Sequence, residues 1–447
     1  MKIDRAFAES VLRSAIARGA DLAEVYLSKS RSLRAEVKEG QPHAIEEKDG
    51  FGYSLRTIKN RRLGFSYSND PSEGDIVVER ALESLRFTED DEFLDIPSPE
   101  GEDAYPVLET FDPEIEAMDT ERAIACAREI EKAAFEFDPR VRKTRKSSAV
   151  FTSYEVLILN SKGISHGFGA TSASASITAV SQENGDSQMG WGYEGGRFLR
   201  QIDFRRAGQE GARKACAMLG AGRAAPCKAG LVLDSSVSVD FLSVVSTMMS
   251  AESVQKGKSL LSDKLDRLVM SRHINIIDDP LMPGSPSTKP MDGEGVRCRR
   301  NVLVSDGLLR GFMHNTYTAK KGGTLTTGNA SRGGGLTMPG VGPQSITIEP
   351  ALEALPVESM TGAIDRGMIV MDAMGVHTIN PVSGEFSIGV SGISIIGGKL
   401  SGPVKEAVIS GNILDFLSSI EAVGNDLRYY GAIGSPSLMV TGVDLSA

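Results

Sequence analysis

The side chains best suited to metal or thiol chemistry are scarce in this chain. Its 447 residues include 5 histidines and 4 cysteines. No two histidines have the spacing H-E-x-x-H, H-x-x-x-H or H-x-x-E-H that zinc hydrolases use. The cysteines contain no C-x-x-C pair, so we expect reduced and mostly buried thiols. The residues concerned are His43, His166, His273, His314, His377, Cys126, Cys216, Cys227 and Cys298. A zinc site would therefore have to be assembled from single, distant residues.

Two glycine motifs have the spacing of functional loops but lack the context that those loops need. The run Gly163–Gly167 matches G-x-S-x-G, which requires a strand before it and a helix after it. The following residues, 169–180, have a β pattern, so we predict a hairpin turn. The run Gly323–Gly328 has the glycine spacing of a P-loop, but Asn329 stands where the phosphate-binding lysine belongs. We expect residues 328–335 to form a flexible loop.

Acidic residues cluster at two points in the second half of the chain. Asp278 and Asp279 precede a proline, and Asp292 and Glu294 each precede a glycine. Such carboxylates could bind a hard cation through oxygen. Asp-Pro and Asp-Gly are also ordinary turn formers after a strand, and this interpretation is favoured.

The overall charge argues against nucleic acid as a partner. The chain has 49 basic and 59 acidic residues, a formal net charge of −10. The densest basic run, residues 140–146, is short and is expected to be a solvated strand face. The first twenty residues lack the apolar region of a signal peptide, and no stretch of about 18 apolar residues occurs. We expect a cytoplasmic protein without a membrane span.

The elements that would position these residues form an α+β chain in two parts. For residues 1–226 we predict a mixed domain of antiparallel hairpins and amphipathic helices, interrupted by an exposed, acidic, Pro-rich linker at about 91–114. For residues 227–447 we predict a β-rich domain, barrel-like or sandwich-like, with covering helices. Helices are expected from Asp4 and over the ranges 74–85, 120–137, 203–219, 235–251 and 412–420.

Turn chemistry divides the predicted strands. Asp49-Gly50 and Asn60 are expected to separate strands in the first hairpins, and Gly167–Gly169 is expected to form a second turn beside 160–163. Thr120 is the expected cap of its helix. Residues 172–178, SASASIT, alternate small apolar and polar side chains, which predicts a strand with one solvated face.

An ordered series of short motifs in the second half carries a family likeness. It comprises Ile277–Pro280, Asp292–Gly295, Ser383–Ser387, Gly397–Lys399, Pro403-Val404, Ser410–Asn412, Gly424–Asp426 and Pro436–Leu438. Together these motifs closely resemble the TldD/PmbA family (peptidase U62), historically called modulators of DNA gyrase. The resemblance covers about Lys228 to the C-terminus and is looser in the first half.

The resemblance implies that the zinc site of the family is missing from this chain. The TldD kind of subunit carries an H-E-x-x-x-H helix and a later cysteine, which hold zinc for peptide hydrolysis. Aligning the chain through Gln255–Ser259 places Leu242 and Thr247 at the histidines and Ser243 at the glutamate. The cysteine corresponds to the region of Asn425, which has no cysteine. We therefore expect no catalytic or metal-binding residues here.

By this resemblance the chain is expected to be a PmbA/TldE-type subunit. In the family, the two kinds of subunit form a heterodimeric protease that degrades unstructured peptides. The zinc would lie in the TldD-like partner, and this chain would shape the substrate channel. Candidate channel residues are Asp279, Asp292, Gly334, Ser383, Gly384 and Phe386.

Two other functions remain as alternatives. The chain could act alone, as a homodimeric binding protein of the gyrase-modulator type without protease activity. It could also be a self-sufficient hydrolase that uses the G-x-S-x-G motif or the Asp clusters.

Overall fold

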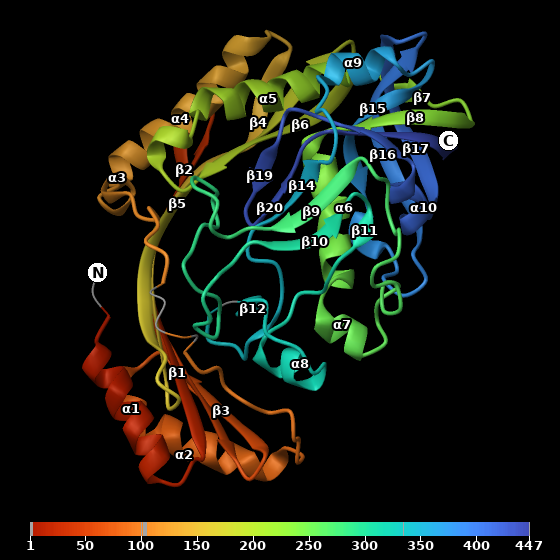
Figure 1. The fold of residues 1–447 in the computed structure, drawn as a ribbon. Coiled ribbons are helices and arrows are strands. Elements are labelled where there is room, and N and C mark those ends of the chain that lie inside the picture. Colours follow the sequence, from red (N-terminus) through yellow and green to blue (C-terminus); the bar gives the residue numbers. More distant parts are fainter. Residues whose placement is uncertain (1–2, 100, 102–104, 334, 447) are drawn as a thin grey trace.

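Two β structures organise the protein in the computed structural model, which describes residues 3–99, 101, 105–333 and 335–446. A long six-stranded sheet occupies the first half of the sequence, and a small closed barrel with a second sheet occupies the other (Figure 1). The predicted α+β class, with a β-rich second half, is confirmed. Among the described residues, no helix combines the length and the apolarity that a membrane crossing requires.

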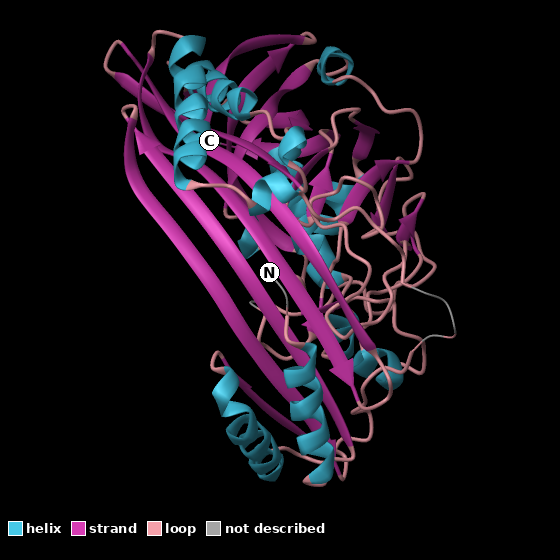
Figure 2. Cartoon of the chain, turned by 90° about the vertical axis from the view of Figure 1, so that its left-hand side faces the viewer, coloured by secondary structure: helices cyan, strands magenta, loops and turns pink. Residues whose placement is uncertain are grey.

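The N-terminal sheet is antiparallel throughout, with strand order β3-β2-β1-β4-β5-β6. Its central strands run nearly the length of the molecule (Figure 2). Helices α1 and α2 pack near one end of the sheet, whereas α4 and α5 pack near the other (Figure 1). The strands are β1 (Leu22–Lys38), β2 (Gln41–Lys59), β3 (Arg62–Ser68), β4 (Val141–Asn160), β5 (Ser165–Glu183) and β6 (Asp186–Gly196), and the helices are α1 (Arg5–Ala17), α2 (Gly74–Ser84), α4 (Thr120–Phe137) and α5 (Phe204–Ala217).

Aspartate caps begin the helices of the first half. Asp4 accepts a hydrogen bond from the backbone N–H of Phe7 at the start of α1, as the sequence predicted. Asp203 does the same for α5. The predicted cap of α4 is wrong: Asp119 accepts from the N–H of Arg122, and Thr120 is the first helical residue. A carboxylate is also favoured there by the helix dipole.

Two predicted turns are instead parts of strands. Gly50 lies inside β2, where a Cβ atom would be 2.6 Å from Ser30 Oγ. Gly167 lies inside β5, where a Cβ atom would be 2.6 Å from the Val156 carbonyl oxygen. These glycines permit close approach between strands and do not reverse the chain. The first reversal occurs at Glu39-Gly40, whose N–H groups donate to the buried Glu131 of α4.

Close packing between α5 and β6 depends on two glycines. A Cβ atom on Gly190 would be 2.2 Å from the Gly211 carbonyl oxygen, and one on Gly192 would be 2.0 Å from the Ala207 carbonyl oxygen. The helix backbone therefore lies directly on the strand. This contact fixes α5 against the edge strand of the sheet, where β6 pairs with β5 alone.

A five-stranded barrel forms the centre of the second half. The strands follow the order β21-β8-β15-β16-β17, and β17 pairs with β21 to close the ring. Short strands β7 and β18 extend it. The bounds are β7 (Gly222–Arg223), β8 (Cys227–Leu233), β15 (Arg366–Met374), β16 (Glu385–Ile396), β17 (Lys399–Asn412), β18 (Ile420–Val423) and β21 (Leu438–Ser446).

A second sheet packs beside the barrel, with helix α6 between them (Figure 1). Its order is β11-β10-β9-β14-β20-β19. Its strands are β9 (Ile274–Asp278), β10 (Asn301–Ser305), β11 (Leu308-Leu309), β14 (Ile346–Pro350), β19 (Arg428–Tyr430) and β20 (Ile433–Ser435). The other elements of this half are α6 (Ser235–Met248), α7 (Ala251–Gln255), α8 (Thr316–Lys321), α9 (Val357–Gly362), α10 (Ile413–Ser418), β12 (Ala330-Ser331) and β13 (Gly340-Val341).

The predicted linker at 91–114 is irregular but is not uniformly exposed. Apart from the start of the short helix α3 (Pro113–Glu116), its described residues form no helix or strand. Ile96 is buried, and Asp112 accepts a hydrogen bond from the N–H of Leu199. Asp95 pairs with Lys320 of α8, which joins this segment to the second half. The expectation of an exposed segment is wrong at these points, because Ile96 and Asp112 have interior partners.

Candidate functional site

Helix α6 carries Leu242, Ser243 and Thr247, the three positions that the sequence resemblance is expected to match to a zinc motif. Asp234 caps the helix by accepting from the N–H of Ser236. Leu242 is 1% exposed and belongs to the core between the barrel and the second sheet. Ser243 is half-buried, Thr247 is exposed, and the Thr247 hydroxyl donates to the Ser243 carbonyl oxygen at 3.3 Å. The helix therefore presents one apolar and two hydroxyl side chains at these positions.

A pocket of about 320 Å³ lies against this part of α6. Asp240, Ser243 and Thr247 line it from the helix, and His377 lines it from the loop after β15. A zinc site needs three or four imidazole, thiolate or carboxylate ligands. Leucine, serine and threonine are not such ligands, and no cluster of three His, Cys, Asp or Glu side chains suited to a metal is found among the described residues. The residues at the aligned positions do not fit zinc.

Asn425 lies in the turn between β18 and β19 and is exposed. Its N–H donates to the Leu355 carbonyl oxygen, and it does not line the pocket at Ser243 and Thr247. The neighbouring Asp426 accepts hydrogen bonds from the backbone and the hydroxyl of Ser437, so this carboxylate organises the turn.

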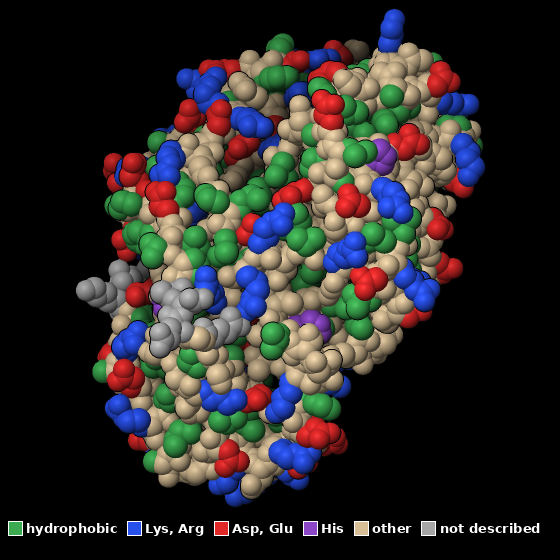
Figure 3. All heavy atoms as spheres, viewed as in Figure 1, with side chains coloured by type: hydrophobic (Ala, Val, Ile, Leu, Met, Phe, Trp, Pro, Cys, Tyr) green, Lys and Arg blue, Asp and Glu red, His purple; other side chains and the backbone are tan. Residues whose placement is uncertain are grey.

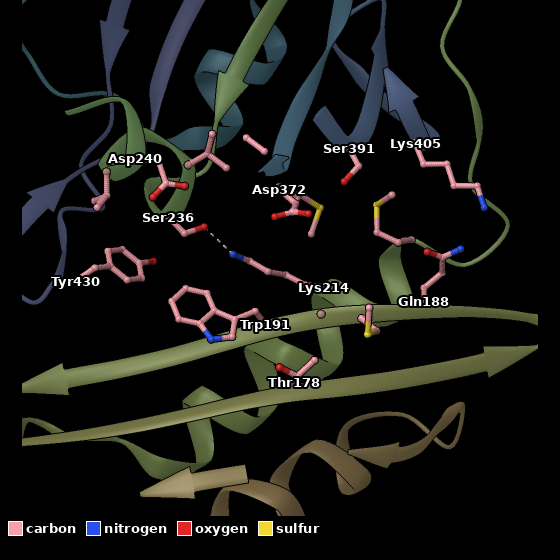
Figure 4. Close-up of a pocket in the computed structure, with 17 residues that line it drawn as sticks. Thr178, Gln188, Trp191, Lys214, Ser236, Asp240, Asp372, Ser391, Lys405 and Tyr430 are labelled. Atoms are coloured by element: carbon pink, nitrogen blue, oxygen red, sulfur yellow. Dashed lines mark hydrogen bonds between the residues drawn. The ribbon is translucent and has the colours of Figure 1, made fainter. Parts of the chain in front are cut away.

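A larger cavity of about 430 Å³ lies between the long sheet and the barrel, and we call it the α6–β6 cavity. Trp191, Lys214, Asp240, Asp372, Lys405 and Tyr430 are among the residues that line it (Figure 4). Asp240 lines both this cavity and the smaller pocket. The cavity and the pocket share Asp240 and Ala373, so they adjoin each other along α6.

Some charged side chains that line the α6–β6 cavity are ion-paired, and others are not. The Lys214 ammonium lies 3.0 Å from Asp234 and 3.5 Å from Glu210, so its charge is already neutralised. Among the described residues, Asp240 and Asp372 have no hydrogen-bond or ion-pair partner. Partial burial and the nearby Asp372 carboxylate raise the pKa of Asp240. The sequence did not reveal these residues, although the single tryptophan, Trp191, is one of them.

The predicted channel residues are dispersed among different local structures. Asp279 is half-buried, and its carboxylate accepts from the N–H of Leu281 and lies 3.7 Å from Arg300. Asp292 is buried and accepts three backbone N–H groups, those of Glu294, Val296 and Ala330. Both carboxylates stabilise turns, as one of the two sequence interpretations held.

The remaining candidates lie near the start of β16. Ser383 is exposed, and Gly384 has a φ of +78°, which favours glycine. Phe386 is 8% exposed and contacts the rings of Phe241 and Phe416, with centroids 6.3 and 5.6 Å away. Phe386 is a core residue in this chain. Gly334 lies outside the described residues.

A buried charge network joins the two halves of the molecule. Arg56 of β2 donates to Glu24 of β1 and to Glu294, each at 2.8 Å. Arg332 donates to Glu24 at 2.5 Å, and its guanidinium lies over the Tyr26 ring. All four charged side chains are at most 6% exposed.

Burial and the nearby Glu294 raise the pKa of Asp292 to about 7, although its three amide donors act in the opposite direction.

Charged side chains of both signs lie on the face seen in Figure 3. Acidic and basic side chains are interspersed over that face, with no continuous basic patch. This distribution agrees with the formal net charge of −10. A protein that binds nucleic acid strongly needs a concentrated set of lysine and arginine side chains.

Family models for three successive domains match this chain. The PmbA/TldA metallopeptidase domain 1 matches residues 23–85, the central domain matches 113–219, and the C-terminal domain matches 226–447. The chain belongs to the PmbA/TldA metallopeptidase family. The family resemblance seen in the sequence is thereby confirmed.

Curated relatives extend over nearly the whole chain. Metalloprotease PmbA of Escherichia coli O157:H7 is 28% identical over 428 residues, covering 94% of this chain and 91% of its own length. A metalloprotease of Methanothermobacter thermautotrophicus is 25% identical, covering 96% and 93%.

Solved structures share the fold of this family member. A putative modulator of a DNA gyrase from Thermotoga maritima has a TM-score of 0.90 at 24% identity, over 99% of both chains. TldE from Thermococcus kodakarensis has a TM-score of 0.89 at 22% identity, over 99% of this chain and all of its own. At these identities the likeness establishes the fold alone.

Proposed function

We propose that this chain is the zinc-free, PmbA/TldE-type subunit of a two-subunit metalloprotease that degrades unstructured peptides. Its TldD-like partner would hold the zinc and perform the hydrolysis. This chain would stabilise the partner and form one wall of the space that admits an extended peptide. An extended peptide could pair with an edge strand, and β6 is such a strand, although Arg428 and Glu210 already bind the backbone of its Tyr193.

The observation that carries the proposal is the type and burial of the side chains that α6 places at the aligned positions. The aligned helix has Leu242 in the core, 1% exposed, where a metal ligand would need to face an open site. Ser243 and Thr247 line a pocket, but their hydroxyls are poor zinc ligands and neutral at pH 7, so they cannot take a proton from a metal-bound water as a glutamate does. The cavity and the pocket that adjoin along α6 remain, and such hollows suit contact with a peptide.

The proposal is tested by purifying the chain alone and together with the TldD-like chain of the same organism. Light scattering should give a heterodimer for the mixture, and metal analysis should give about one zinc per heterodimer and none in this chain alone. Stoichiometric zinc in the isolated chain would overturn the assignment. If this chain forms a homodimer and does not associate with the TldD-like chain, the alternative of a stand-alone regulatory protein would be favoured.

A further inference from the structure

The α6–β6 cavity has a chemical character that the proposed function does not explain. Its volume of about 430 Å³ is within the range of small-ligand sites. The walls come from both halves of the fold: strands β5 and β6 and helix α5 on one side, and helix α6 with strands β15, β16, β17 and β19 on the other (Figure 4). The cavity is therefore created by the tertiary structure and lies where the two halves of the chain face each other.

One end of the cavity is anionic and lacks a counter-ion. Asp240 projects from α6 and Asp372 from β15, and both line the cavity (Figure 4). The adjacent Lys214 does not neutralise them, because it is held by Asp234 and Glu210. Asp240 and Asp372 are both exposed to solvent, and the charge of Asp372 acts on Asp240, so a cation placed between the two carboxylates would relieve their mutual repulsion.

The wall beside these carboxylates is aromatic. The Trp191 ring stacks on Tyr193 with centroids 5.4 Å apart, and Tyr193 stacks on Tyr430 at 5.3 Å. Trp191 is 41% exposed, so its indole remains available to a ligand. Indole is the ring that binds cations best. Carboxylates and an indole together favour an organic cation with an apolar stem.

Other lining residues favour an organic cation over a metal ion as the ligand. Met189, Val237 and Met371 supply apolar surface, which a hydrated Mg²⁺ or Ca²⁺ does not use. Calcium takes six to eight oxygen ligands, more than two carboxylates and a few hydroxyls supply here. Lys405 lies at the end away from Asp240 (Figure 4), where its ammonium suits a carbonyl or carboxylate oxygen of the same ligand.

We propose that the α6–β6 cavity binds the side chain of a lysine or arginine residue in an extended peptide, with its cationic group between Asp240 and Asp372 and its stem against Trp191. The peptide nature of the ligand rests on the proposed function, whereas the preference for a cation rests on the cavity alone. The site would give this subunit a sequence preference for basic residues in the substrate.

Trp191 provides a direct readout because it is the only tryptophan in the chain. The full chain is titrated with acetyl-Gly-Lys-Gly-amide and with the same peptide containing norleucine, which has a similar length and no charge. Tryptophan fluorescence and calorimetry should both show binding of the lysine peptide that is at least tenfold tighter. The double variant Asp240→Asn/Asp372→Asn should weaken that binding at least fivefold.

A charge-matched double variant, Asp75→Asn/Asp90→Asn, alters two exposed carboxylates in the first hundred residues and should bind as the native chain does. Equal binding of the two peptides, binding unaffected by Asp240→Asn/Asp372→Asn, or no binding in calorimetry would overturn the cavity proposal. None of these results would alter zinc content or heterodimer formation, so the proposed function would be judged separately.

Discussion

Arg56 of the long sheet and Glu294 of the C-terminal half are 238 residues apart and form a buried hydrogen-bonded ion pair at 2.8 Å. Arg56 also binds Glu24, and Glu24 binds Arg332, so the four charges alternate in sign across the junction. Such a network costs desolvation, but once it is formed each member depends on the others. The pair therefore ties the orientation of the long sheet to that of the barrel half.

Removing one member of this network should destabilise the protein strongly. Glu294→Ala leaves Arg56 with one of its two partners, and we expect the free energy of unfolding to fall by about 3 kcal/mol. Urea denaturation followed by circular dichroism measures the change. Asp90→Ala breaks an exposed pair with Arg61 and should change stability by less than about 1 kcal/mol. Equal effects of the two substitutions would show that the buried pair is not a structural link.

The raised pKa of Asp292 predicts a pH-dependent stability. Its pKa of about 7 in the folded protein lies above the ordinary value of 3.8, so the folded state binds the proton more tightly than the unfolded state does. This contribution to the free energy of unfolding is complete below about pH 4 and is lost as the pH rises through about 7. The free energies of unfolding of the native protein and of Asp292→Asn should therefore be compared at pH 5 and at pH 8. The native protein should gain stability relative to the variant when the pH is lowered from 8 to 5. A difference that is independent of pH would contradict this prediction.

Phe386 should act as a core residue and not as a channel residue. Phe386→Ala removes a ring that packs on Phe241 and Phe416, and should cost about 3–5 kcal/mol of stability. Val382→Ala, four residues away at a half-exposed side chain, should cost less than about 1 kcal/mol. If Phe386→Ala unfolds as the native protein does but binds peptide less tightly, the original channel assignment is correct.

The contact between α5 and β6 should not tolerate a methyl group. Gly192→Ala would place Cβ 2.0 Å from the Ala207 carbonyl oxygen, so the helix must move, at a cost of about 2–3 kcal/mol. The control is Gly222→Ala, where a Cβ would meet no atom within 4 Å. Thermal unfolding should separate the two variants. Similar melting temperatures would mean that α5 shifts on the sheet without cost.

Local patterns predicted much of the fold. The Asp4 cap, the amphipathic helices and the alternation in residues 172–178 describe interactions within a few residues, and the structure contains them. The turns predicted at Gly50 and Gly167 are wrong, because a glycine that permits close strand packing looks the same in sequence as one that forms a turn. The distinction depends on the neighbouring strand, which a single sequence does not specify.

The sites were harder to predict because they join distant segments. The α6–β6 cavity combines residues from Thr178 to Tyr430, and none of its segments has a motif of its own. Similarly, no local signal marks Glu24, Arg56, Glu294 and Arg332 as partners. The family resemblance located Leu242, Ser243 and Thr247, but the structure was needed to show that a pocket lies beside two of them.

This chain is proposed to support hydrolysis without performing it, and peptide cleavage by defined subunit mixtures is the sharpest test of that role. An unstructured fluorogenic peptide is incubated with this chain, with the TldD-like chain, and with both. We predict that the mixture cleaves the peptide. Cleavage should be abolished when the glutamate of the partner's H-E-x-x-x-H motif is replaced by glutamine. It should persist when this chain carries Ser243→Ala/Thr247→Ala. Cleavage by this chain alone, sensitive to chelators and lost in Ser243→Ala/Thr247→Ala, would contradict the account.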